Sequence, residues 1–164
     1  MSDETTASEL SRSDFLKLAG LSALVPLLGG VTRASAAEGK AERLYIVTHA
    51  DDDVDRAALA LILASLDAKK IGKELSGVTI WFVLQGAKLC RKGVAEKLTS
   101  PVFKKLGTLA EILAASTKAG AKLGACPFCL DALNLAKSDY IAGLERKGGD
   151  YVTAQVGKAD VIWL

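Results

Sequence analysis

The stretch Ala121-Lys122-Leu123-Gly124-Ala125-Cys126-Pro127-Phe128-Cys129 places a short apolar run directly before two cysteines that are separated by two residues. In residues 130–137, which follow, apolar side chains recur at helical spacing. This order predicts a strand, a tight turn and a helix. Pro127 favours the first helical position, because the N–H that proline lacks is one that a helix start leaves unpaired. We therefore expect Cys126 at the helix N-terminus, where free N–H groups and the helix dipole favour a thiolate.

The rest of the chain alternates between strand and helix patterns. Two apolar runs, 43–49 and 78–84, are continuous enough for strands buried on both faces of a sheet. Helical periodicity covers 54–71 and 106–119. After the cysteines we expect a helix at 128–137, a short helix at 139–146, a strand or helix at 152–156 and a last strand at 160–164. This alternation predicts the α/β class, with a doubly wound, mostly parallel sheet of about five strands.

Ligands of doubly wound sheets bind outside the carboxyl ends of the strands. Three expected strand ends carry reactive side chains to that edge: His49 after the first strand, Cys90 shortly after the second, and Cys126 and Cys129 after the third. The candidate site therefore contains the single histidine and all three cysteines. His49 suits a base or hydrogen-bond donor for a thiol, or a strand-end histidine held by the backbone. Cys90 suits a thiolate favoured by the two cations that follow it, or a small buried residue.

Other kinds of site match the chain less well. The tetrapeptide 126–129 looks like a glutaredoxin motif, but no proline follows Cys129, and the thioredoxin fold needs a cis-proline there. A zinc site built from Cys126, Cys129, Cys90 and His49 has only one ligand pair at zinc-like spacing. We expect no bound metal.

The acidic loop 48–53 argues against nucleotide cofactors. Its three aspartates would repel a phosphate, and the chain has neither a G-x-G-x-x-G nor a Walker pattern, so neither FMN nor NAD is expected. An EF-hand fails as well, because Arg56 occupies the position of the required glycine. Asp52 or Asp53 instead suits the N-cap of the following helix.

Composition excludes two classes of partner. The chain has 21 basic and 19 acidic residues, a formal charge of +2, which gives no electrostatic basis for binding nucleic acid or an anionic membrane. Three cysteines are too few for a disulfide scaffold.

Residues 1–36 have the pattern of an export signal. The segment 11–17 resembles a twin-arginine signal in which Ser13 replaces the second arginine, and an apolar run at 18–31 follows it. That run is shorter than the roughly 20 residues that span a bilayer. Ala34-Ser35-Ala36 has the small-x-small form of a cleavage site. We expect cleavage after Ala36, a periplasmic domain at 37–164 and no stable membrane insertion afterwards. The alternatives are an amphipathic helix or uncleaved anchor, and a cytoplasmic protein if the signal is not used.

The order of motifs along 43–164 resembles the DsrE/DsrF-like family of small flavodoxin-like proteins, which includes the sulfur-carrying DsrE and TusD-type subunits. The matching features are Thr48-His49 after the first strand, Arg56-Ala57-Ala58 in the first helix, Gly86 after the second strand, Lys92-Gly93, Gly120 after a helix, the strand that reaches Cys126, and Ala159-Asp160 before the closing strand.

The resemblance implies a sulfur carrier in which Cys126 bears a persulfide and passes its sulfur to a partner thiol. It also implies a homo-oligomer, a trimer or hexamer, with sulfur donor and acceptor proteins or small sulfane compounds as partners. Cys129 and the export signal depart from the carriers of the family. Three hypotheses follow: a sulfur carrier, a dithiol–disulfide oxidoreductase that uses Cys126 and Cys129, and a non-catalytic oligomeric or ligand-binding module.

Overall fold

Five parallel strands form one sheet in the computed structural model, which describes residues 41–164. The order across the sheet is β4-β3-β2-β1-β5. The strands are β1 (Ala41–Val47), β2 (Leu75–Phe82), β3 (Lys122–Ala125), β4 (Leu144–Arg146) and β5 (Ala159–Trp163). The expected fold class is confirmed: the domain is a flavodoxin-like, doubly wound α/β structure. The expected export segment at 1–36 lies outside the described residues.

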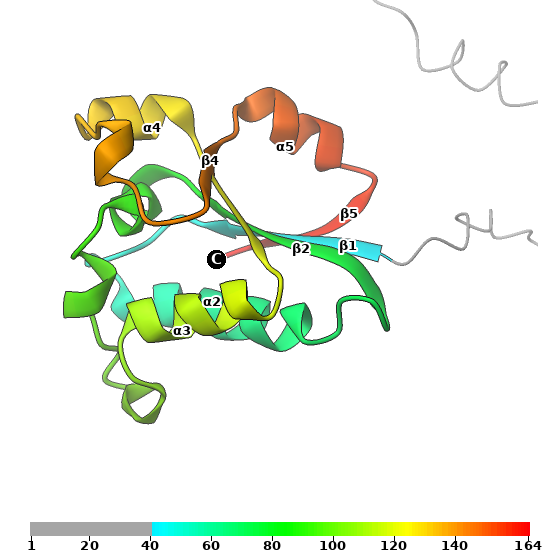
Figure 1. Ribbon diagram of the computed structural model, residues 1–164, viewed down its shortest axis with the longest axis horizontal. Helices are drawn as coiled ribbons and strands as arrows, with labels where there is room; N and C mark the ends of the chain where they lie inside the picture. Colours follow the sequence, from blue (N-terminus) through cyan, green and yellow to red (C-terminus); the bar gives the residue numbers. More distant parts are fainter. Residues whose placement is uncertain (1–40) are drawn as a thin grey trace, which may run out of the picture. The chain divides into compact units, whose positions relative to one another are not determined.

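Helices cover both faces of the sheet. In Figure 1, α2 (Val54–Ala68) and α3 (Leu109–Lys118) lie on one face and α5 (Gly149–Gln155) lies on the other. The short helix α4 (Pro127–Ala132) directly follows β3. Four single-turn or slightly longer 3₁₀ segments complete the described part: η1 (Leu84–Cys90), η2 (Ala95–Lys97), η3 (Lys104–Leu106) and η4 (Lys137–Asp139).

The strands alternate their side chains between two apolar layers. Tyr45 and Val47 of β1 pack with Ile80 and Phe82 of β2 in the larger core, on the side of α2 and α3. The neighbouring positions face the other side, where Leu44, Ile46 and Trp81 pack against Tyr151 and Val152 of α5. Burial on both faces explains why β1 and β2 are continuous apolar runs in the sequence.

Side chains fix where the two long helices begin. Asp53 is the N-cap of α2, and its carboxylate accepts a hydrogen bond from the Arg56 N–H at 3.0 Å. This confirms the expectation that the acidic loop caps the helix. Thr108 and Glu111 form a reciprocal capping box at the start of α3. Each cap satisfies N–H groups that the first helical turn leaves unpaired.

The segment after α4 differs from the sequence expectation. The helix expected at 128–137 ends at Ala132, and Asn134 then adopts a left-handed conformation with φ of 49°. The expected helix at 139–146 is wrong, because Leu144–Arg146 form strand β4 beside β3. The ambiguous segment 152–156 lies mostly in helix α5. Among residues 41–164, no helix is long and apolar enough to cross a membrane.

Candidate functional site

The carboxyl ends of β1, β2 and β3 lie side by side and carry the candidate site. Val83 donates its N–H to Val47 at 3.0 Å, and Cys126 donates its N–H to Phe82 at 3.0 Å. The loops that leave the three strands therefore start at one edge of the sheet, as the sequence predicts. This edge brings together α4, η1 and the acidic loop after β1.

Cys126 is the N-cap residue of α4, and Pro127 follows it in the first turn, as expected. Its backbone is extended, with φ of −62° and ψ of 119°, and its side chain makes no capping hydrogen bond. The Cys126 thiol is half-buried and is not part of a disulfide. It is therefore accessible and free to react.

Cys129 lies in the first turn of α4, where its sulfur meets the turn that follows β2. The Leu84 N–H donates to the Cys129 Sγ at 3.2 Å. Burial raises the pKa of the Cys129 thiol, the hydrogen bond and charge of Cys126 raise it further, and the Leu84 N–H acts in the opposite direction. The Cys129 thiol thus stays protonated more readily than an ordinary cysteine.

The backbone around Leu84 is strained where it meets the Cys129 sulfur. Leu84 has a φ of 54°, a left-handed conformation that costs a residue with a side chain about 1–2 kcal/mol. Its side chain is exposed, so packing of that side chain does not explain the conformation. Two residues later, a Cβ on Gly86 would lie 2.2 Å from the Val47 carbonyl oxygen, so only glycine lets η1 approach β1 this closely. The turn is thereby held against the sheet with the Leu84 N–H directed at Cys129.

Cys90 lies behind Cys129, in the larger core, with no exposed surface. Burial raises the pKa of the Cys90 thiol strongly, and the charge of Cys129 adds to this effect. The two cations that follow Cys90 are engaged elsewhere: Arg91 donates to the Leu133 carbonyl at 3.0 Å, and Lys92 donates to the Ser138 carbonyl at 2.6 Å. Cys90 is therefore a small buried residue next to the pair Cys126 and Cys129, which we call the dithiol.

Both ring nitrogens of His49 have partners in its own loop and helix. Its Nδ1 lies 2.6 Å from the Asp52 carboxylate, and its Nε2 lies 3.2 Å from the Arg56 guanidinium. Because Arg56 can only donate, Nε2 accepts and Nδ1 carries the proton. In this arrangement neither nitrogen is free to take a proton from a thiol. Within residues 41–164, no group of three or more His, Cys, Asp or Glu side chains is placed to hold a metal ion.

A pocket of about 220 Å³ lies at the same edge of the sheet. Its charged side chains are Asp51 from the loop after β1, Lys88 from η1 and Arg91 just after η1; its apolar walls are Val94, Leu133 and Leu135. Lys88 binds the Asp51 carboxylate at 2.7 Å, and this hydrogen bond is the main cause that lowers the pKa of Asp51. Sequence reasoning missed this site, because its residues come from three distant segments and share no motif.

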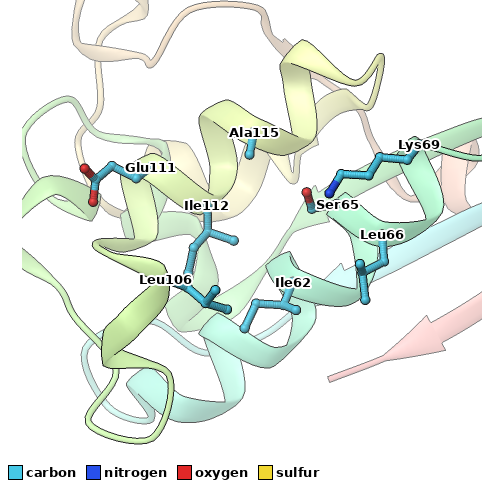
Figure 2. Close-up of a pocket in the computed structure, with 8 residues that line it drawn as sticks. All are labelled: Ile62, Ser65, Leu66, Lys69, Leu106, Glu111, Ile112 and Ala115. Atoms are coloured by element: carbon cyan, nitrogen blue, oxygen red, sulfur yellow. The ribbon is translucent and has the colours of Figure 1, made fainter.

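A second pocket, of about 230 Å³, lies between α2 and α3, on the helical layer (Figure 2). Its floor is apolar, and Lys69 and Glu111 lie toward its opposite ends. Neither cysteine nor histidine is among its lining residues, so it offers no thiol chemistry. The residues that line it are Ile62, Ser65, Leu66, Lys69, Leu106, Glu111, Ile112 and Ala115.

Comparison with solved structures agrees with this architecture. The ychN protein from E. coli superposes with a TM-score of 0.59 at 14% identity, covering 77% of this chain and 99% of the other. MTH1491 from Methanobacterium thermoautotrophicum superposes with a TM-score of 0.50 at 17% identity, covering 76% and 99%. No family model and no curated protein matches the sequence. The described domain thus has a DsrE/YchN-like fold, and at these identities the likeness establishes the fold alone.

Proposed function

We propose that this protein is a sulfane-sulfur carrier with Cys126 as the nucleophile that bears the persulfide. The observation that carries the proposal is the pairing of Cys126 with Cys129: an accessible thiol at the end of β3 lies beside a second thiol that burial keeps protonated. Cys126 is the N-cap of α4 and Cys129 is its third residue, so both thiols belong to the first turn of one helix. The thiolate is the form of cysteine that attacks sulfur.

The transfer step needs no cofactor. The Cys126 thiolate attacks the outer sulfur of a hydropersulfide R–S–SH, a bond forms between the two sulfurs, and the S–S bond of the donor breaks. The donor leaves as R–S⁻, and Cys126 carries –S–SH. A partner thiolate then attacks the outer sulfur of this persulfide in the same way, and Cys126 leaves as a thiolate.

The placement of both thiols at the start of α4 also supports a second function, dithiol–disulfide exchange. In that reaction a partner disulfide accepts two electrons, Cys126 and Cys129 lose their two protons, and a bond forms between their sulfurs. Both functions start from the same Cys126 thiolate. They differ in whether Cys129 becomes covalently bonded.

Intact mass measured after incubation with polysulfide separates these functions. We expect wild type to gain the mass of sulfur, Cys126→Ser to gain none, and Cys129→Ser to retain the adduct. A loss of two hydrogens on oxidation, abolished by either substitution, supports the dithiol function instead. If neither an adduct nor a disulfide forms under either treatment, both proposals fail and the non-catalytic module is left.

We propose further that the protein acts after export, with donor and acceptor proteins or small sulfane compounds as its partners. The support is the signal pattern at 1–36. The mass of the protein isolated from cells with its thiols preserved tests both parts of the proposal. A chain that begins at Ala37 and carries additional sulfur supports them, whereas a full-length chain with unmodified thiols contradicts them.

A further inference from the structure

The charged pocket beside η1 has a mixed lining that suits one class of ligand. Arg91 and Lys88 supply positive charge and Asp51 supplies negative charge, while Val94, Leu133 and Leu135 form apolar walls. Arg91 uses one donor on the Leu133 carbonyl, and a guanidinium has five donors, so others are left for a carboxylate. The Asp51 carboxylate accepts from Lys88 through one oxygen and has further lone pairs for an ammonium group. A ligand that has a carboxylate and an ammonium group close together can bind Arg91 through the first and Asp51 through the second.

The segments η1 and α4 lie side by side and connect the pocket to the dithiol. At one end η1 meets α4 where the Leu84 N–H reaches the Cys129 sulfur. At the other end, just after η1, Arg91 reaches the Leu133 carbonyl, and the Leu133 N–H donates to the Cys129 carbonyl at 3.1 Å. One helical turn, about 5 Å along the axis, thus separates Cys129 from the wall of the pocket. A ligand whose charged group binds in this pocket therefore needs a flexible chain of several bonds between that group and its sulfur atom, so that the sulfur can reach Cys126.

We propose that this pocket binds the zwitterionic amino-acid head of a low-molecular-weight thiol, whose hydropersulfide is the sulfur donor to Cys126. The inference rests on the proposed carrier function and names its substrate class. The head is fixed by Arg91 and Asp51, the chain of the ligand runs along α4, and its terminal sulfur meets the Cys126 thiolate. The Cys126 thiolate takes the outer sulfur, and the small thiol leaves as R–S⁻ with the electron pair of the broken S–S bond.

Binding can be measured apart from sulfur chemistry with S-methylglutathione, which has a γ-glutamyl head and no reactive sulfur. Calorimetry on the full chain should show saturable binding to wild type. Arg91→Ala should weaken it by about tenfold or more, because a charge-assisted hydrogen bond is lost. Asp51→Asn should weaken it through the ammonium group. Lys92→Ala is the matched control, since Lys92 is the adjacent cation and does not line this pocket, and we expect its affinity to equal that of wild type.

Donor selectivity then connects the pocket to the reaction. We compare initial rates of sulfur addition to Cys126 from glutathione hydropersulfide and from the hydropersulfide of N-acetylcysteamine, which lacks the head. Arg91→Ala should raise the half-saturating concentration of the first donor about tenfold and leave the rate with the second unchanged.

The possible failures are distinguishable. Absence of S-methylglutathione binding to wild type, or equal binding to Arg91→Ala, overturns the pocket assignment even where Cys126 accepts sulfur. Saturable, Arg91-dependent binding with no sulfur on Cys126 from either donor supports the ligand class and overturns the carrier function.

Discussion

The three cysteines differ in access to solvent, and this difference decides their chemistry. Cys126 and Cys129 are half-buried, whereas Cys90 has no exposed surface. Burial disfavours the thiolate, and the pKa of Cys90 is raised on this account. Proximity of a cysteine to the candidate site is therefore not enough to make it reactive.

Alkylation should follow this order of exposure. With iodoacetamide at neutral pH, we expect native protein to take a label on the half-buried Cys126 and, slowly, on Cys129, whose raised pKa leaves little of the reactive thiolate. Cys90 should take none, because it has no accessible surface. In denaturant, all three cysteines should react. Mass spectrometry of peptides assigns each label, and Cys90→Ala serves as the control for the third site. Rapid labelling of Cys90 in the native protein would contradict its placement in the core.

At the residue scale, the sequence predicted the position of Cys126 but not the environment of its neighbours. Pro127 after an apolar run is a local signal for a helix start, and the structure has the N-cap there. The burial of Cys90 depends on how η1 packs below α4, a tertiary effect with no local pattern. The partners of His49 are close in sequence, at Asp52 and Arg56, and spacing of three and seven residues around a helix start is the signal that could have found them.

Among the elements, β1 and α2 are joined by a cluster of three polar side chains, of which Tyr45 and Asp67 are buried and Arg43 is half-buried. Asp67 of α2 accepts hydrogen bonds from the Tyr45 hydroxyl and the Arg43 guanidinium of β1. Burial acts to raise the pKa of Asp67, but the hydrogen bonds from Tyr45 and Arg43 outweigh it and hold this pKa below its ordinary value. The charged carboxylate therefore stabilises the packing of the helix on the sheet.

Asp67→Asn should lower the free energy of unfolding at neutral pH by about 1.5–3 kcal/mol, the range for hydrogen bonds to charged groups. Because the folded-state pKa of Asp67 lies below its unfolded value of about 3.9, this stabilisation is complete at neutral pH. It is lost as the pH falls from that value through the folded-state pKa, so the difference between wild type and variant should shrink in acid. Urea unfolding at several pH values measures the difference.

Asp160→Asn is the control for this prediction. Asp160 lies 3.8 Å from the Arg43 guanidinium, but its side chain is 66% exposed. Exposed ion pairs contribute little, so we expect its effect to stay below about 1 kcal/mol at every pH. An Asp67→Asn effect as small as that of Asp160→Asn would show that the cluster does not stabilise the fold.

Strand β4 shows why one element could not be read from the sequence. Leu144–Arg146 contain one apolar residue followed by two charged residues, so the segment lacks the alternation of apolar and polar side chains that indicates a strand. The segment becomes a strand because the edge of β3 offers it backbone partners, and Lys147 then donates its N–H to the Ala125 carbonyl at 2.9 Å. Strand formation there is set by tertiary context and not by propensity. The longer strands β1 and β2, buried on both faces, were predictable for the opposite reason.

Across the whole domain, one edge of the sheet leaves apolar surface uncovered. Strand β5 stands at the end of the strand order and pairs with β1. Val161 and Trp163 lie beside Leu44 and Ile46, on the face that α5 covers, yet they are 40% and 64% exposed. Helix α5, of seven residues, leaves these two side chains exposed. Exposed apolar side chains on an edge strand are typical of contact surfaces, and we propose that copies of this chain associate through β5.

Light scattering coupled to size-exclusion chromatography should therefore give a mass that is a multiple of the subunit mass. Trp163→Lys should shift the protein toward the monomer, because a charge would be buried without a partner at the contact. Val102→Lys is the matched control: Val102 is 69% exposed but lies in the loop before η3, away from β5, so the oligomer should persist. Circular dichroism checks that both variants are folded. A wild type that elutes as a monomer over a wide concentration range would contradict self-association, and the dithiol would then act within a single subunit. An equal response of the two variants would show that β5 is not the contact surface.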